Sequence, residues 1–291
     1  MNDVAELFVD SRCELGEGPF WHPLLHRLFW FDIPNNTLLS ANADGHLVDR
    51  FTFKDSVAAA AVIDGDRLAV AQAGVLLDFS MSADRSHPIV ELAGEPVSNR
   101  TNDSRVHPSG AFWIGTMSRH GTVEPKVGNI YHYRHGVLTT LLSERGIPNA
   151  TCFTPDGRRA YYTHTGDTIF TCETDPATGM PVSEWTPFVT LDAPGVADGA
   201  VVDSEGYLWN ARWNGSCVLR IAPDGTIDRQ IDVPASRVTC PAFGGDDLKT
   251  LYLTTARAGL TPEQLEEQPL AGGVFAIRVD VPGQPEPLIA L

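Results

Sequence analysis

The sequence predicts an all-β protein with the architecture of a six-bladed β-propeller. Six times in 291 residues, a polar turn is followed by a short segment rich in β-forming residues. The copies begin at intervals of 42, 43, 47, 49 and 41 residues, close to the period of one four-stranded blade. No long segment shows the periodicity of an amphipathic helix, and no linker or shift in composition divides the chain. We therefore expect one domain over residues 1–291.

The repeat can be followed along the chain by its turns. Its copies begin at His22, Asp64, His107, Thr154, Asp203 and Gly244. Most copies continue into a second short strand that ends at an Asp-Gly or Pro-x-x-Gly turn, as expected for β-hairpins. A short helix is predicted at 261–268, where Thr261 can cap the first turn and Pro262 fits within it. Regular strands and turns would also fit a β-sandwich, but the constant period favours the propeller.

Composition and charge limit the possible classes of function. The chain has 21 Lys and Arg against 37 Asp and Glu, a formal net charge of −16. A nucleic-acid partner is not expected, because phosphate contacts need clustered basic residues. The five cysteines are widely spaced without a CxxC pair, which indicates reduced thiols. Since neither a secretory signal nor an apolar stretch of membrane-spanning length is found, we expect a cytoplasmic protein without a membrane partner.

One position of the repeat carries a chemical pattern. Counting back five residues from each turn gives Glu17, Ala59, Asn102, Asn149, Asp198 and Thr239. Equivalent positions at the start of the inner strands of a propeller face the central channel together. Two carboxylates and two amides at one level would suit a hard divalent cation such as Ca²⁺, Mg²⁺ or Mn²⁺. The alternative is that these residues only form caps and turns, a common role of Asn and Asp.

Longer motifs surround these positions. They are LGEGPFW (15–21), FDIPNNTL (31–38), SNRTND (98–103), FWIGTM (112–117), DGAVVDSEGYLWNARW (198–213), CPAFGGDDLKTLYLTTAR (240–257) and PLAGGVFAI (269–277). In these segments the sequence resembles the gluconolactonase family of six-bladed propellers that includes regucalcin. The resemblance implies one divalent metal ion on the channel axis, with Ca²⁺ the first candidate and Zn²⁺, Mn²⁺, Mg²⁺ or Fe²⁺ as alternatives. It also implies hydrolysis of a sugar lactone to the aldonic acid in sugar catabolism.

The same resemblance assigns roles to individual residues. It implies that the metal ligands are Glu17, Asn149 and Asp198. It also implies that the substrate-binding residues are Arg100, Asn102 and Glu124. The metal would polarise the lactone carbonyl, and Asp198 or metal-bound hydroxide would activate the attacking water. Asp103 is a second candidate base, but a hydrogen bond in a turn or between blades is its favoured interpretation.

Three residues depart from the family pattern. Ala150 follows Asn149 where glycine is usual, and Ala197 precedes Asp198 where proline is usual. Each of these alanines is the immediate sequence neighbour of an implied metal ligand, so it affects the backbone that carries the ligand. His164 stands where many members have aspartate, which changes either the packing of a blade or the polarity of the pocket.

Two other functions use the same residues. A related metal-dependent esterase or organophosphate hydrolase could work with the same ring of ligands, and a more apolar pocket would favour it. A non-enzymatic propeller that binds Ca²⁺ or a protein partner is the third interpretation, which a pocket closed to small molecules would favour. The tryptophans of the blade strands are expected in the core, whereas Trp213 lies where it could line the mouth of the pocket.

Overall fold

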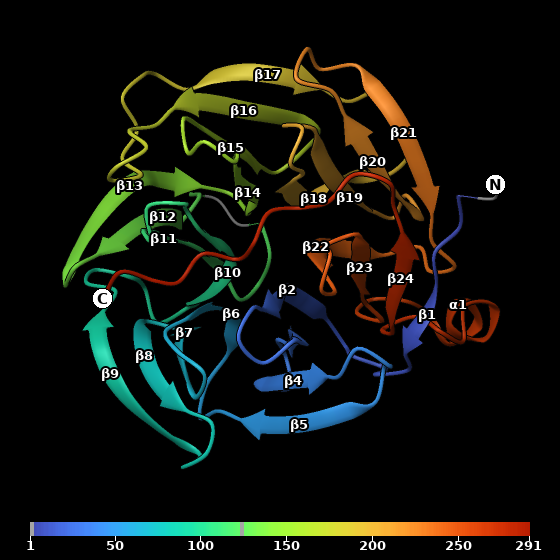
Figure 1. Cartoon of the computed structure of the whole chain (residues 1–291), viewed down its shortest axis with the longest axis horizontal. Helices are drawn as coiled ribbons and strands as arrows, with labels where there is room; N and C mark the ends of the chain where they lie inside the picture. Colours follow the sequence, from blue (N-terminus) through green and yellow to red (C-terminus); the bar gives the residue numbers. More distant parts are fainter. Residues whose placement is uncertain (1–2, 123–124) are drawn as a thin grey trace.

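The blades form a closed ring around a central axis. The computed structural model describes residues 3–122 and 125–291. Within these ranges the chain forms six four-stranded antiparallel sheets (Figure 1). This confirms the predicted six-bladed propeller. One strand of each sheet faces the axis, and these inner strands are β2, β6, β10, β14, β18 and β22.

Each blade is built from strands that pair with their neighbours in the chain. The first three blades are β2 (Gly16–His22), β3 (Arg27–Asp32), β4 (Thr37–Ala41) and β5 (Leu47–Thr52); β6 (Val57–Val62), β7 (Arg67–Gln72), β8 (Val75–Ser80) and β9 (Arg85–Glu91); and β10 (Asn99–Val106), β11 (Phe112–Ser118), β12 (Gly128–Arg134) and β13 (Val137–Arg145). The next two are β14 (Pro148–Phe153), β15 (Arg159–His164), β16 (Thr168–Glu173) and β17 (Thr186–Thr190); and β18 (Val196–Val202), β19 (Leu208–Trp213), β20 (Cys217–Ile221) and β21 (Ile227–Asp232). The sixth comprises β22 (Val238–Gly244), β23 (Thr250–Thr255), β24 (Val274–Arg278) and β1 (Glu6–Val9).

The sixth blade joins the two ends of the chain. Its outermost strand, β1, comes from the N-terminus and pairs antiparallel with β24, so that Leu7 lies opposite Phe275. Asp3 Oδ1 forms an ion pair with Arg229 of the fifth blade at 2.6 Å. The turn-based repeat did not predict this strand. Its pairing covers the edge of β24 and closes the ring.

A β-bulge interrupts every inner strand near its beginning. In all six described blades the pairing between the inner strand and its neighbour shifts by one residue. The shifts fall at Glu17/Phe20, Val57/Ala59, Thr101/Ser104, Asn149/Cys152, Ala197/Ala200 and Val238/Cys240. Bulges re-aim side chains and are frequent beside functional sites. Each of the six positions found by counting back from the turns lies within or beside one of these bulges.

Hydrophobic side chains between the blades form the core. Trp30, Trp113 and Trp209 are at most 1% exposed and Trp21 is 4% exposed, as predicted for tryptophans of blade strands. The Trp113 ring packs against Phe153 of the next blade with 5.0 Å between the ring centroids and an angle of 82°. Truncating such a buried aromatic residue to alanine typically costs about 3–5 kcal/mol. Contacts of this kind hold neighbouring blades together.

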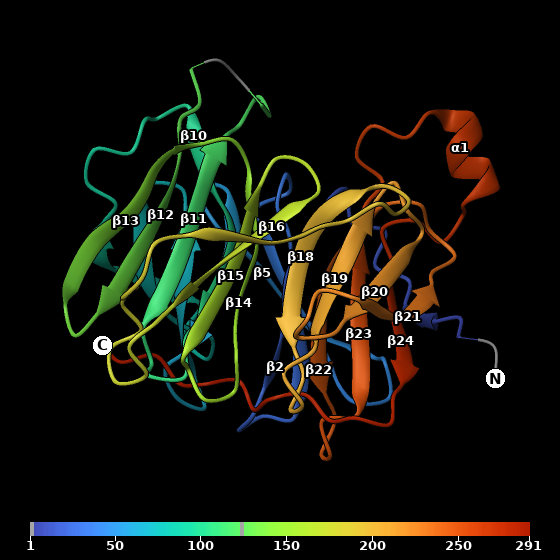
Figure 2. The ribbon, with the colours of Figure 1, turned by 90° about the horizontal axis from the view of Figure 1, so that it is seen from above.

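The C-terminal segment crosses one face of the ring (Figure 1), opposite the face that carries the short helix (Figure 2). In the described part of the chain it is hydrogen-bonded to five blades, through the pairs Gly283–Leu248, Gln284–Val202, Gln284–Phe153, Ala290–Gly110 and Ile289–Val62. Glu286 of this segment pairs with Arg105 of β10 at 3.6 Å. The segment therefore covers the end of the channel at which the inner strands finish.

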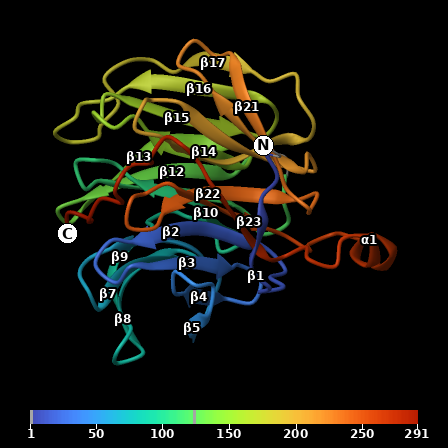
Figure 3. The same ribbon diagram turned by 45° about the vertical axis from the view of Figure 1, so that its right-hand side comes forward.

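The predicted helix is present as α1 (Pro262–Glu267), at the outer edge of the ring (Figure 3). Thr261 and Gln264 form a reciprocal capping box, and Pro262 occupies the first turn, as the sequence predicts. The five cysteines are buried and free, also as predicted. No helix of the described residues is long and apolar enough to cross a membrane.

Candidate active site

The residues predicted from the repeat meet in one pocket. It has a volume of about 460 Å³ and lies where the inner strands begin. Its lining consists of Leu15, Glu17, Arg100, Asn102, Met117, Ile147, Asn149, Thr165, Gly166, Val196, Ala197, Asp198 and Trp213. All four carboxylate and amide positions of the repeat are among them, and so is Arg100 of the SNRTND motif. Glu124, the remaining predicted contact, lies outside the described residues.

Two buried carboxylates lie in this pocket. Glu17 and Asp198 are 7% and 6% exposed. Burial raises the pKa of Glu17, as does the negative charge of nearby Asp103. Burial and the charge of Glu17 raise the pKa of Asp198 well above its usual range. Like charges held together away from water are unfavourable unless a cation compensates them, so this pair fits a divalent ion.

The backbone beside Glu17 needs a glycine. Gly18 has a φ of +54°, and a Cβ atom there would lie 2.1 Å from the carbonyl oxygen of Ala58. Its N–H donates to Glu17 Oε2 at 3.0 Å. The Gly-Glu-Gly sequence thus lets the bulge of the first blade approach the second blade closely while it holds the carboxylate.

The amide side chains form a hydrogen-bonded chain between two blades. Arg100 Nη1 donates to Asn102 Oδ1 at 2.7 Å, and Asn102 Nδ2 donates to Asn149 Oδ1 at 2.8 Å. Asn102 Nδ2 also donates to the carbonyl of Pro148 at 2.9 Å. An amide oxygen has two lone pairs, so Asn149 Oδ1 keeps one for a cation. The chain of bonds orients this oxygen and holds the Arg100 guanidinium against Asn102.

Asp103 is buried and is not among the residues that line the pocket. Its Oδ2 accepts the N–H of Thr151 at 2.7 Å, which joins the third blade to the fourth. Burial raises the pKa of Asp103 to about 6. The sequence favoured an inter-blade hydrogen bond for this residue over a role as base, and the structure contains that bond.

The wall of the pocket is mostly apolar. Leu15, Met117, Ile147, Val196 and Trp213 contribute to it. Of these, only Trp213 was singled out from the sequence, as a candidate for the pocket mouth. Isolated apolar residues carry no signal of their own, because their meeting point depends on how the blades close. A ring of such residues around polar groups is typical of small-molecule sites.

His164 packs within its blade. Its ring stacks on Phe170 and Tyr162, with centroid distances of 5.3 and 5.8 Å. Burial lowers the pKa of His164, which favours the neutral ring. Of the two roles considered from the sequence, blade packing is the one that these contacts support.

The predicted set of metal ligands includes an amide oxygen as well as carboxylates. Across residues 3–122 and 125–291, no group of three or more His, Cys, Asp and Glu side chains is placed to hold a metal ion. The candidate set contains two carboxylates, Glu17 and Asp198, with Asn149 as third donor. Such a set matches the preference of hard cations for oxygen.

A comparison with known protein families agrees with this geometry. The sequence model of the SMP-30/Gluconolactonase/LRE-like region matches residues 15–257. The chain belongs to this family. The match confirms the resemblance drawn from the sequence motifs, and it spans the strands that carry all the described pocket residues.

Relatives of the chain in this family include named lactonases. A pentonolactonase of Haloferax volcanii is 36% identical over 289 residues, which are 96% of this chain and 95% of the relative. An L-arabinolactonase of Azospirillum brasilense is 36% identical over 277 residues, 93% of this chain and 90% of the relative. The crystal structure of regucalcin from Agrobacterium tumefaciens, described as a calcium-binding protein, has a TM-score of 0.94 at 33% identity. It covers 99% of this chain and 98% of its own, which confirms the fold.

Two departures from the family pattern change the backbone beside candidate ligands. Ala150 has a φ of +55°, in the left-handed region where glycine is favoured. An alanine in this conformation costs about 1–2 kcal/mol relative to the right-handed one. Ala197 donates its N–H to Asp167 Oδ1 at 3.2 Å, a bond that proline could not make. The chain thus holds the backbone before Asp198 with a hydrogen bond that a proline at position 197 would remove.

Proposed function

We propose that the protein is a metal-dependent sugar lactonase that hydrolyses an aldonolactone to the aldonic acid in sugar catabolism. The observation that carries this proposal is that one pocket is lined by Glu17, Asn149 and Asp198, each from a different blade. Arg100 and Asn102 of the third blade line the same pocket. Two carboxylates and an amide suit a divalent cation, for which Ca²⁺ is our first candidate. The relatives named as lactonases support a lactone as the substrate.

In this proposal each pocket residue has a defined task. Glu17, Asn149 and Asp198 hold the ion, which when bound polarises the lactone carbonyl. Asp198 takes a proton from the water that attacks the carbonyl carbon. It returns the proton to the ring oxygen as the bond between that oxygen and the carbonyl carbon breaks. Hydrogen bonds from Arg100 and Asn102 orient the sugar hydroxyls.

Arg100 is suited to bind a ligand. In the described part of the chain its hydrogen bonds are made by Nη1, to Thr101 O at 2.8 Å and to Asn102 Oδ1. The Nε and Nη2 donors are thus left for a substrate. Burial lowers the pKa of Arg100 to about 10, so it stays charged at neutral pH. We also retain Glu124 as a proposed contact to sugar hydroxyls.

The proposal is tested by acid release from a panel of five- and six-membered aldonolactones. Chelator-stripped protein is reconstituted separately with Ca²⁺, Mg²⁺, Mn²⁺, Fe²⁺ and Zn²⁺, and each rate is corrected for spontaneous hydrolysis. We expect at least one ion to restore turnover of at least one lactone. If no ion restores turnover of any sugar lactone, the proposed activity is wrong.

The apolar wall supports a second candidate function. Leu15, Met117, Ile147, Val196 and Trp213 would contact a less polar substrate favourably, as in an esterase or organophosphate hydrolase. Alkyl lactones, aryl esters and phosphotriesters are therefore assayed with the same protein samples. Faster turnover of these than of any sugar lactone would support the second candidate. If the protein binds Ca²⁺ but hydrolyses neither the sugar lactones nor these less polar substrates, the calcium-binding propeller is supported instead.

Replacing Arg100 with methionine is expected to raise KM for the lactone about 10–100-fold, with a smaller change in kcat. The reason is that a hydrogen bond from a charged donor contributes about 1.5–3 kcal/mol to binding. Arg100→Lys keeps the charge without the planar fork and should recover part of the loss. Arg85→Met, in the exposed outer strand β9, is the control. A fall in kcat at unchanged KM would argue against a substrate-binding role.

A further inference from the structure

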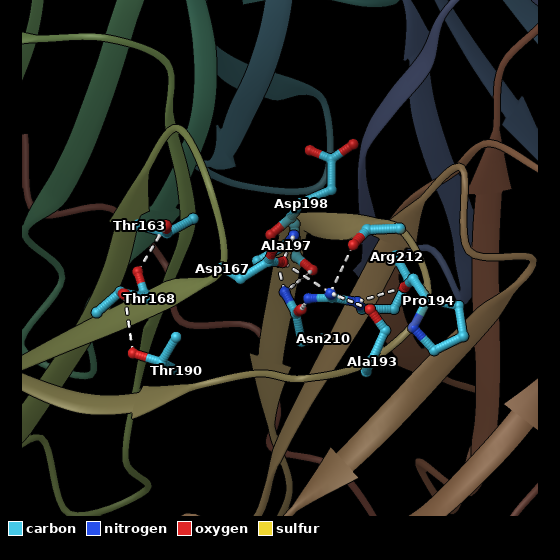
Figure 4. Close-up of polar contacts among 12 residues, drawn as sticks. Thr163, Asp167, Thr168, Thr190, Ala193, Pro194, Ala197, Asp198, Asn210 and Arg212 are labelled. Atoms are coloured by element: carbon cyan, nitrogen blue, oxygen red, sulfur yellow. Dashed lines mark hydrogen bonds and ion pairs between the residues drawn. The ribbon is translucent and has the colours of Figure 1, made fainter.

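Arg212 is a fully buried arginine on β19, directly opposite Ala197 in the fifth blade. We propose that it is a positioning residue, which together with Asp167 of the fourth blade holds the backbone that carries Asp198. This inference rests on the proposed function, because it concerns the placement of the proposed metal ligand and base. The residues of the network are drawn in Figure 4.

The guanidinium of Arg212 binds the loop that leads to Asp198. Its Nη2 donates to the carbonyl of Gly195 at 2.8 Å, and its Nε donates to the carbonyl of Pro194 at 3.0 Å. The same Nη2 lies 2.7 Å from Asp167 Oδ1. A planar guanidinium holds several acceptors at fixed angles, which the single ammonium of lysine cannot do. The loop of the fifth blade is therefore tied to a loop of the fourth.

Asp167 extends this connection to the residue before Asp198. Its Oδ1 accepts the N–H of Ala197 as well as the Arg212 hydrogen bond. Asp167 lies between β15 and β16, next to Thr165 and Gly166, which line the pocket. The ion pair thus joins two walls of the pocket, one from each blade.

Asn210 holds the bulge on the other side of Asp198. Its Nδ2 donates to the carbonyls of Asp198 at 3.0 Å and Gly199 at 3.3 Å. Arg212 Nη1 donates to Asn210 Oδ1 at 3.4 Å. Figure 4 shows the Asp198 carboxylate directed away from Arg212. Arg212 contacts Gly195 and Asp167 on one side of Asp198 and Asn210 on the other. It therefore acts on the Asp198 carboxylate through the backbone.

A second buried arginine of the same blade provides a comparison. Arg220 pairs with Asp203 at 2.7 Å, with Glu205 at 2.9 Å and with Asp228 at 2.8 Å. Asp203 begins the turn after β18, at the opposite end of the blade from Asp198. Both arginines form ion pairs within the blade ring, whereas the described contacts of Arg212 also reach the backbone beside a pocket residue. Arg220→Met is therefore a matched control.

The test measures the metal affinity of stripped protein by calorimetry, and kcat and KM at saturating ion. Arg212→Met is expected to lower kcat about 10–100-fold and to weaken metal binding about tenfold, because small displacements of reacting groups are costly. Asp167→Asn should act in the same direction by about 3–10-fold. Arg220→Met is expected to lower the unfolding temperature while kcat and the metal Kd stay within twofold of wild type.

A purely structural role of Arg212 gives a different pattern. If Arg212→Met lowers only the unfolding temperature, as Arg220→Met does, the proposal is overturned. If Arg212→Met does not fold, the proposal is tested with Asp167→Asn instead. Unchanged kcat and unchanged metal Kd in Asp167→Asn then overturn the proposal. If the wild type hydrolyses no lactone, the proposed activity fails, but the metal Kd values still test the positioning role. A wild type that binds no metal would overturn both.

Discussion

Replacing Asp198 with alanine is expected to lower kcat/KM for the preferred lactone by about 10³-fold or more. The side chain serves twice in the proposed reaction, as a metal ligand and as the base that takes the proton of water. A positioned acid–base group contributes about 10²–10⁴-fold by itself, and loss of a ligand adds to this. The measurement is steady-state hydrolysis at saturating metal ion, with the wild type assayed beside the variant.

The variant Asp198→Asn separates the two roles. It keeps the size of the side chain and one oxygen donor, but its amide cannot take a proton at neutral pH. We expect calorimetry to detect weaker metal binding that is still measurable, and kcat to stay at least about 100-fold below wild type even with the ion bound. Asp192→Asn, an exposed position six residues earlier, is the control and should leave both quantities unchanged. Wild-type turnover by metal-loaded Asp198→Asn would show that this carboxylate is not the base.

Replacing Glu17 with glutamine is expected to change metal affinity and the stability of the metal-free protein in opposite directions. Metal binding should weaken by about 100-fold or more, since loss of one charge from a buried charge pair costs about 3–5 kcal/mol. The metal-free variant should unfold at a higher temperature than the metal-free wild type. The reason is that Glu17 is buried and that its charge repels those of Asp103 and Asp198.

The two effects are measured on the same protein samples. Calorimetric titration gives the metal Kd, and scanning calorimetry in excess chelator gives the unfolding temperature. Glu14→Gln, an exposed position three residues earlier, should change neither. A metal-free Glu17→Gln protein that unfolds below the wild type would mean that the carboxylate stabilises the fold without an ion. That outcome would remove the main physical argument for a cation at this place.

The fold could be predicted because each blade repeats the same local sequence. Asp-Gly turns and short alternating strands are encoded by neighbouring residues, so the period of about 44 residues is visible in a single sequence. The same register placed Glu17, Asn102, Asn149 and Asp198 at equivalent positions before the structure showed them in one pocket. The bulges explain why equivalent positions met, since every inner strand described is interrupted at or beside that position.

Other features of the site could not be predicted in this way. The hydrogen bond from Asn102 to Asn149 crosses from one blade to the next, and the repeat gives no hint of which side chains meet across that boundary. The apolar wall is assembled from residues as distant as Leu15 and Trp213. Arg212 lies inside a recognised motif, but nothing in its sequence neighbourhood points to Asp167, 45 residues earlier.

The number of blades, the level of the channel at which the oxygen donors lie, and the family all follow from the amino-acid sequence alone. These depend on short-range patterns that recur along the chain. The three-dimensional structure was needed to show how β1 closes the sixth blade, how the C-terminal segment covers the far end of the channel, and how Arg212 is bound beside Asp198. These contacts join residues far apart in the chain, and their partners are set by the closure of the ring.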